Sequence, residues 1–131
     1  MFKKNRVEVR QREYDGLRSH IFLQQGDLPQ TNLSITWVDV PPGAGQMLHR
    51  HAPEQVYVII EGTGRMRVGE EEEEVVKGDL IYIPPDVVHA IQNRSSDMLS
   101  YISAATPPFD IAAYYDLPTD AERASKDSSA D

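Results

Sequence analysis

The 131-residue chain is predicted to fold as an all-β protein of the sandwich or barrel class. Short runs rich in β-branched and aromatic residues recur along it, and glycine, proline, asparagine or aspartate separates one run from the next. No long stretch has the 3.6-residue apolar period of an amphipathic helix. Proline also excludes helix at 41–42, 84–85 and 107–108. The length fits a single domain with one hydrophobic core.

The predicted elements follow one another with short connections. Residues 1–20 form a polar N-terminal arm, in which Val7–Val9 is expected to add an edge strand, and residues 21–116 are expected to make the barrel. Residues 117–131 are small, polar and charged and are expected to be disordered, whereas 109–115 is expected to pack on the barrel or a partner. The predicted barrel strands are 19–24, 33–40, 46–51, 55–61, 65–68, 74–76, 80–83, 88–93 and 99–105.

Composition excludes several classes of partner. The net charge of −8 argues against nucleic acid, which needs a basic face, and against an anionic membrane surface. The absence of cysteine excludes disulfides, thiolate metal ligands and cysteine nucleophiles. The N-terminus lacks the apolar run of a signal peptide, and no stretch approaches the roughly 18 apolar residues of a membrane span. We therefore expect a cytoplasmic protein whose partner is a small molecule.

Three of the four histidines are spaced as metal ligands would be. His49 and His51 are two residues apart on a predicted strand, so both side chains face the same way. A tight turn then brings Gln55, at the start of the return strand, close to the pair. His89 comes from a different strand later in the chain. His20 fits no pattern and is expected on the surface or hydrogen-bonded in the core.

These four side chains would make a mixed nitrogen and oxygen shell. Three imidazoles and a carboxamide oxygen suit Mn, Fe, Co, Ni or Zn, with little selection among them. The lack of a thiolate disfavours Cu(I). Four protein ligands in an octahedral shell would leave roughly two positions for water or substrate.

Two segments resemble the two motifs of the cupin superfamily. The first motif is Gly, five residues, His-x-His, three or four residues, Glu, six residues, Gly; at those spacings the chain has Gly43, His49-Arg50-His51, Gln55 and Gly62. The second is Gly, five residues, Pro-x-Gly, two residues, His, three residues, Asn; here the chain has Gly78, Pro84-Pro85-Asp86, His89 and Asn93. The match covers residues 43–93.

The chain departs from these motifs at two positions. Gln55 stands where many cupins have glutamate, so the site has one negative charge fewer, which weakens metal binding and makes a bound ion a stronger electrophile. Glu54 is the alternative fourth ligand, reached by a shift of one residue. Asp86 replaces the glycine of the second motif, in a turn whose geometry aspartate tolerates.

The resemblance implies a fold and a cofactor. The fold is a double-stranded β-helix, a small jelly-roll cupin barrel with one divalent transition metal in its mouth. The implied ligands are His49, His51, Gln55 and His89. Manganese or iron is favoured, with zinc, nickel and cobalt as alternatives. Cupins commonly dimerise through strand edges, so the resemblance also implies a homodimer.

Two functions are compatible with such a site. The first is a metal-dependent isomerase, lyase or dioxygenase that acts on a small polar carboxylate or sugar-derived molecule. The alternative is a non-catalytic module that binds or senses a small ligand. A general acid or base beside the metal would favour the enzyme, and an all-apolar cavity would favour the binder. The candidate catalytic residues are Glu54, Tyr57 and Tyr101, and the candidate substrate-binding residues are Arg65, Arg67 and Tyr82.

Two further patterns predict which residues face the solvent. Arg65 and Arg67 alternate with Met66 and Val68, so one pair faces the interior and the other faces out. Arginines that face in would hold a substrate carboxylate in a bidentate manner. The acidic run 70–74 is expected to be a solvated hairpin tip.

Overall fold

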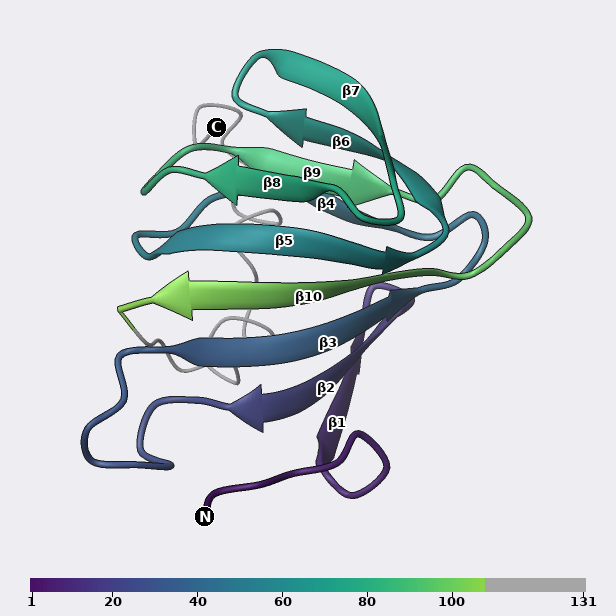
Figure 1. Cartoon of the computed structure of the whole chain (residues 1–131). Helices are drawn as coiled ribbons and strands as arrows, with labels where there is room; N and C mark the ends of the chain where they lie inside the picture. The colour runs from purple at the N-terminus through teal and green to yellow at the C-terminus, as the bar shows by residue number, and fades with distance from the viewer. Residues whose placement is uncertain (108–131) are drawn as a thin grey trace.

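A computed structural model describes residues 1–107, and in this range the chain forms ten β-strands and no helix (Figure 1). The barrel strands expected from the sequence all occur, most of them within two residues of their expected ends. The strands are β1 (Arg10–Tyr14), β2 (Leu17–Leu23), β3 (Ser34–Val40), β4 (Gly45–His49), β5 (Glu54–Glu61), β6 (Thr63–Val68), β7 (Glu71–Val76), β8 (Leu80–Ile83), β9 (His89–Gln92) and β10 (Leu99–Thr106).

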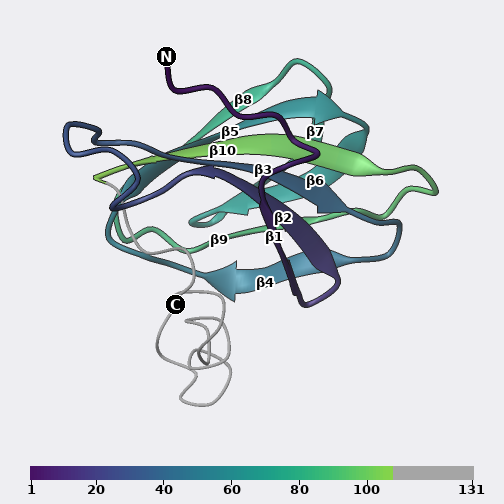
Figure 2. The same cartoon turned by 90° about the horizontal axis from the view of Figure 1, so that it is seen from below.

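The strands form two antiparallel sheets that enclose one core. One sheet has six strands in the order β1-β2-β3-β10-β5-β8, and the other has four in the order β4-β9-β6-β7. From β3 onward, the chain crosses to the other sheet at nearly every connection, for example between β4 and β5 and between β8 and β9, and β6–β7 is the exception. Figure 2 shows the two layers, with β4 on one side and β5 and β10 on the other. This arrangement confirms the predicted double-stranded β-helix.

The core lies between the two sheets and follows the two-residue period of the strands. On β5, for example, Gln55, Tyr57 and Ile59 are buried while the residues between them are partly exposed. Burial of each large apolar side chain contributes about 1.5–3 kcal/mol to stability. The core cluster consists of Leu17, Val38, Val40, Tyr57, Ile59, Met66, Val75, Ile83, Ile91, Leu99 and Tyr101.

The edge strand expected at Val7–Val9 is misplaced, because the structure has this strand at Arg10–Tyr14. The polar sequence of β1 has no apolar alternation. A tight turn sets its position instead: Asp15 and Gly16 both have positive φ, at 56° and 85°, and join Tyr14 to its partner Leu17. Two residues with positive φ are the hallmark of a two-residue β-hairpin with Asp-Gly at its tip.

The acidic run was also placed wrongly as a hairpin tip. Val68 pairs with Glu71 across the β6–β7 hairpin, so the tip consists of Gly69 and Glu70 alone. The other glutamates of the run are the first four residues of β7, where they are exposed to solvent. Carboxylates on an edge strand hinder its pairing with another chain.

Gly62, the last residue of the first motif, has a structural reason to be glycine. Its φ is +80°, and a Cβ atom there would lie 2.3 Å from the carbonyl oxygen of Met98. A side chain is therefore excluded both by the backbone conformation and by the close approach of another segment.

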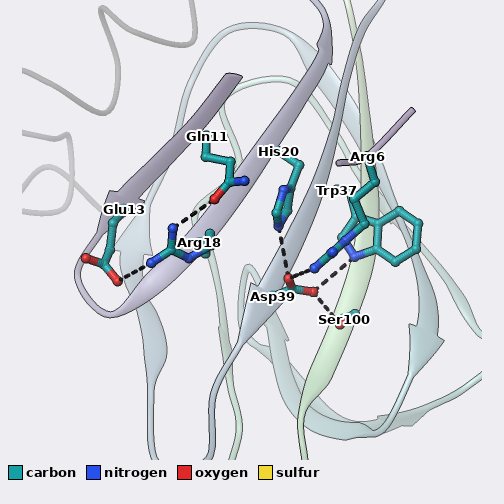
Figure 3. A network of polar contacts seen from close by, with 8 residues as sticks. All are labelled: Arg6, Gln11, Glu13, Arg18, His20, Trp37, Asp39 and Ser100. Atoms are coloured by element: carbon teal, nitrogen blue, oxygen red, sulfur yellow. Dashed lines mark hydrogen bonds and ion pairs between the residues drawn. The ribbon is translucent and has the colours of Figure 1, made fainter. Parts of the chain in front are cut away.

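A polar network centred on Asp39 lies on the outer face of the six-stranded sheet (Figure 3). One carboxylate oxygen accepts hydrogen bonds from Arg6 and from His20 Nε2, and the other accepts from Trp37 Nε1 and from Ser100 Oγ. The Arg6 guanidinium also lies 5.1 Å from the centroid of the Trp37 ring. The network therefore joins the N-terminal arm to β2, β3 and β10.

The predictions for the C-terminal residues and for the domain boundaries are not tested by the structure. Residues 109–115 and 117–131 lie outside the described part of the chain, and the division of the chain at residues 20 and 116 stays a prediction. Within residues 1–107, no helix is long and apolar enough to span a membrane.

Candidate metal centre

The three predicted histidine ligands come together inside the barrel. His49 ends β4 and pairs with His89 at the start of β9, and His51 follows two residues after His49. One ring nitrogen of each lies within 4.8 Å of the others. All three side chains are buried, and His89 is completely inaccessible to solvent. The i, i+2 spacing and the strand pairing therefore place three imidazoles around one point, as expected.

Backbone carbonyls fix two of the three rings. His49 Nδ1 lies 2.8 Å from the carbonyl oxygen of Met47, and His89 Nδ1 lies 3.0 Å from that of Val87. A carbonyl oxygen only accepts, so each Nδ1 carries the proton and each Nε2 keeps its lone pair. Nε2 of His89 is buried and has no hydrogen-bond partner within residues 1–107. This tautomer is the one that a metal-binding imidazole needs.

Gln55 has the orientation of an oxygen ligand. It is buried on the inner face of β5, and its Nε2 donates a 2.7 Å hydrogen bond to Ser103 Oγ on β10. Its Oε1 is buried and has no hydrogen-bond partner in the part of the chain that the structure describes. A buried amide oxygen without a partner is costly, which a metal ion in contact with it would relieve. The donor set therefore fits one divalent ion.

Glu54, the alternative fourth ligand, faces the other way. Gln55 and Ile83 are paired and both buried, so their neighbours Glu54 and Tyr82 point to the outer face. There the Tyr82 hydroxyl donates a hydrogen bond to Glu54. This hydrogen bond is the main reason that the pKa of Tyr82 is raised above its usual value of 10.0. The structure thus separates Glu54 and Tyr82 from the three histidines.

Tyr57 and Tyr101 face the interior. Their rings stack with centroids 4.1 Å apart, and the Tyr57 ring centroid lies 6.1 Å from that of His89. The Tyr57 hydroxyl donates a 2.9 Å hydrogen bond to Oε1 of Gln46 on β4. Of the candidate catalytic residues, Tyr57 therefore has its ring beside His89 and its hydroxyl bound to a side chain of β4.

Arg65 and Arg67 face out. Met66, which lies between them on β6, is buried in the core. Arg65 Nε lies 3.4 Å from Glu72, and Arg67 Nε donates a 2.8 Å hydrogen bond to the carbonyl oxygen of Gly69. Both arginines therefore point away from the interior, where they would have to lie to hold a substrate inside the barrel.

The turn that precedes His89 is hydrogen-bonded to the segment that carries His51. Asp86 has a φ of 62°, in the left-handed region that aspartate tolerates better than most residues. Its backbone N–H donates a 2.9 Å hydrogen bond to the carbonyl oxygen of His51. The residue that replaces the motif glycine therefore has the backbone conformation that glycine would supply, and the turn ties the His51 segment to the His89 segment.

The environment of His89 keeps it neutral. Burial, and then repulsion from His49, lower the pKa of His89 well below its usual value of 6.5. A neutral imidazole is the form that binds a metal.

Sequence reasoning missed two residues beside the centre and one network partner of His20. Ser103 lies at an inward position of β10, between Tyr101 and Ala105, and Gln46 lies on the strand that leads to His49. His20 was expected on the surface or hydrogen-bonded in the core, and it is buried with its Nε2 3.1 Å from Asp39. The signal in the sequence that could have predicted this pairing is Asp39, a charged residue within the largely apolar strand 33–40.

Comparisons with known proteins agree with this architecture. The family model for the cupin domain, Cupin_2, matches residues 36–105. An uncharacterised protein of Methanocaldococcus jannaschii is 40% identical over 77 residues, which cover 58% of this chain and 62% of that protein. A mannose-6-phosphate isomerase of Arabidopsis thaliana is 26% identical over 81 residues, which cover 62% of this chain and 18% of that enzyme.

Solved structures share the fold. An RmlC-like cupin from Shewanella frigidimarina superposes with a TM-score of 0.71 at 18% identity, over 82% of this chain and 91% of that one. An oxalate decarboxylase from Bacillus subtilis superposes with a TM-score of 0.73 at 23% identity, over 82% of this chain and 30% of that one. From its barrel and its family match, this chain is a member of the cupin domain family.

Proposed function

We propose that the chain is a metal-dependent enzyme that acts on a small polar molecule, either a carboxylate or a sugar derivative. His49, His51, Gln55 and His89 would hold one divalent transition ion, with manganese or iron favoured. The observation that carries the proposal is the cluster of three buried histidines, together with two buried atoms that have no hydrogen-bond partner within residues 1–107, Gln55 Oε1 and His89 Nε2. Such atoms are rare in folded proteins unless they meet a ligand.

The bound ion would supply a Lewis acid that polarises a carbonyl or enolate oxygen. The chain supplies the rest of the site. Backbone carbonyls orient two imidazoles, and Ser103 turns the amide of Gln55 so that its oxygen is available. The ligand set is uncharged, so an anionic substrate is not repelled by a carboxylate ligand.

Tyr57 is the proposed proton donor or acceptor. Its hydroxyl is held by Gln46, and its ring lies next to His89. Glu54 is a weaker candidate, because it hydrogen-bonds Tyr82 on the outer face. Tyr101 stacks on Tyr57 and would fix its ring.

The relatives support the choice of substrate class and ion. The solved and curated proteins that resemble this chain include an oxalate decarboxylase and a mannose-6-phosphate isomerase. Mn(II) centres are described in the Bacillus subtilis oxalate decarboxylase. These proteins share the fold with the chain but are much longer than it, so their reactions guide only the choice of compounds to test.

One observation favours the alternative, a non-catalytic module that binds a small ligand. Among residues 1–107, Asp39 is the only buried carboxylate, and it belongs to the network on the outer face of the six-stranded sheet. The centre therefore has no buried carboxylate to move protons. If Tyr57 does not act in proton transfer, the same cavity would bind a ligand without turning it over.

Elemental analysis tests the metal centre. The protein is purified without a nickel column, and its metal content is compared with that of His49→Ala, His89→Ala and the control His20→Ala. We expect about one ion per chain in the wild type and in His20→Ala, and loss of the ion from the other two variants. A wild type that contains no metal and takes up none from added Mn(II), Fe(II) or Zn(II) would contradict the proposal.

Product analysis distinguishes an enzyme from a binder. The metal-loaded protein is incubated with small dicarboxylates, keto acids and sugar phosphates, and the mixtures are followed by NMR. Turnover that is lost in both His89→Ala and Tyr57→Phe supports the enzyme. Saturable binding of one of these compounds without any product supports the ligand-binding module.

Assembly and location stay predictions. We propose a cytoplasmic homodimer that associates through a strand edge. Light scattering coupled to size-exclusion chromatography measures the oligomeric state, and a monomer at micromolar concentration would contradict the dimer.

A further inference from the structure

The outer face of the four-stranded sheet carries a cluster of arginines, two of which were expected to bind a substrate inside the barrel. Met66 and Ile91 are buried in the core, so the residues that alternate with them on β6 and β9 face outward. Arg65 and Arg67 are two of these residues. Arg94 follows β9 directly beyond Gln92 and is exposed.

Small neighbouring side chains leave a hollow between these arginines. Arg67 lies opposite Ala90 in the β6–β9 ladder, and Arg65 lies opposite Gln92. Ala90 cannot fill the space beside Arg67 because its side chain is a single methyl group. The hollow has a volume of about 230 Å³. Its lining residues are Gln46, Met47, Leu48, Arg65, Met66, Arg67, Glu72, Ala90, Gln92 and Arg94.

The arginines keep unused hydrogen-bond donors. Within residues 1–107, Arg67 uses only its Nε, which donates to the carbonyl oxygen of Gly69, and Arg65 uses only its Nε, at 3.4 Å from Glu72. Arg94 donates to the amide oxygen of Gln92 through Nε and one terminal nitrogen. Terminal guanidinium nitrogens of all three therefore remain available, and such groups bind carboxylate and phosphate oxygens in pairs.

The hollow is positively charged in an acidic protein. Among the described residues, its lining contains three arginines and a single acid, Glu72, whereas the whole chain has a net charge of −8. Glu74 faces the same side of β7 opposite Arg65 but does not line the hollow. Met47 and Leu48 give the hollow one apolar side. A ligand suited to these walls has an anionic group and a short apolar part.

We propose that this hollow is a second binding site, separate from the metal centre, for a small organic oxyanion that carries a phosphate or carboxylate group. Arg65, Arg67 and Arg94 bind the anionic group, and Met47 and Leu48 contact the apolar part. The site lies on the outer face of β9, the strand that begins with His89 on its inner face. Of the residues placed at the metal centre, Gln46, which holds the Tyr57 hydroxyl, also lines the hollow.

Calorimetric titration tests the site. The protein as purified is titrated with inorganic phosphate and, separately, with succinate, at constant ionic strength, because a surface cluster also attracts ions non-specifically. We expect saturable one-to-one binding of at least one anion. The affinity should fall about tenfold in Arg65→Gln and in Arg94→Gln, as each removes charged donors. Tighter binding of phosphate would assign a phosphorylated ligand, and tighter binding of succinate a carboxylate ligand.

Two matched variants keep the outcome clear. Arg18→Gln removes the same charge from the other sheet, where Arg18 hydrogen-bonds Gln11 and Glu13, and should leave binding unchanged. His51→Ala disables the metal centre and should also leave binding unchanged. The proposal is overturned if no saturable binding occurs, if Arg18→Gln weakens binding as much as Arg94→Gln, or if His51→Ala abolishes binding while the arginine variants retain it.

Discussion

Two groups of buried polar side chains, one inside the barrel and one on the outer face of the six-stranded sheet, use histidine in opposite ways. In the Asp39 network, both carboxylate oxygens receive two hydrogen bonds each, and every donor belongs to the chain. In the histidine centre, Gln55 Oε1 and His89 Nε2 are buried and have no partner. The Asp39 carboxylate is fully hydrogen-bonded by the chain itself, whereas the convergent donors of the histidine centre call for a ligand from outside.

The difference shows how to distinguish structural from functional polar residues. A lone unmatched atom is not enough, because Nδ1 of His20 is also buried without a partner. What marks the centre is convergence, since nitrogens of three histidines lie within 4.8 Å of one another. Losing a residue of the network should therefore cost stability, and losing a residue of the centre should cost metal affinity.

The largest effect is expected from Asp39→Ala. It removes the acceptor of four hydrogen bonds and leaves His20 buried without its partner. We expect the free energy of unfolding to fall by about 3 kcal/mol, the low end for a broken buried ion pair, because Arg6 is partly exposed. Urea denaturation measures this loss. The metal content of the folded variant should equal that of the wild type, and a lower content would mean that the two groups are coupled.

His89→Ala should reduce metal affinity strongly and stability only slightly. We expect metal affinity to fall at least about 100-fold, since even residues that only support metal ligands account for 10–100-fold. The metal-free variant should unfold with a smaller loss of free energy than Asp39→Ala, because the substitution also removes a buried nitrogen that has no partner. Competition with a chromogenic chelator measures the affinity. His20→Ala serves as the control, and it should bind metal normally.

Ser103→Ala is expected to have an intermediate effect. Ser103 contacts no ion but accepts a hydrogen bond from the Gln55 amide and so keeps Oε1 free. Without the hydroxyl, the amide can rotate, and metal affinity should fall about tenfold. The same chelator competition applies. A Ser103→Thr variant, which retains a hydroxyl, should recover most of the affinity; equal losses in both variants would argue for a packing role instead.

Acid titration should give the smallest effect. Burial raises the pKa of Asp39, but hydrogen bonds from Ser100, Arg6, His20 and Trp37 outweigh it and lower the pKa below 3.8. A carboxyl group whose pKa is lowered by folding stabilises the protein above its unfolded-state pKa, and this contribution is lost as the pH falls through the folded-state value. Unfolding free energies of metal-free wild type and Asp39→Asn should therefore converge at the acid end. Parallel curves would show that Asp39 ionises alike in both states.

Much of the fold, and the convergence of the three histidines, was predictable from the sequence, for identifiable reasons. Alternating apolar residues and turn residues marked the barrel strands, and the His-x-His spacing specified a common face. β1 was placed wrongly because it has no apolar alternation, and the Asp15-Gly16 hairpin signal was overlooked. The side on which Arg65 lies depends on which face of β6 meets the core, and strand alternation alone does not decide that.

The Asp39 network could not be predicted from the sequence, for a different reason. Its members are Arg6, His20, Trp37, Asp39 and Ser100, which are scattered over most of the chain. Only the pairing of β2 with β3 and of β3 with β10 brings them together. A single sequence states which residues could form such bonds, but the register of three strands decides which of them do.

The hydrogen bond from Asp86 N–H to the carbonyl oxygen of His51 joins the two ligand-bearing segments by the chain's own contacts. The barrel would thus fold first and acquire its ion afterwards. Nitrogen and oxygen donors of this kind discriminate weakly among first-row divalent metals. The ion found in the purified protein would then record the metal supply of the cells that produced it, and preparations from manganese-rich and zinc-rich media would differ in content while having the same fold.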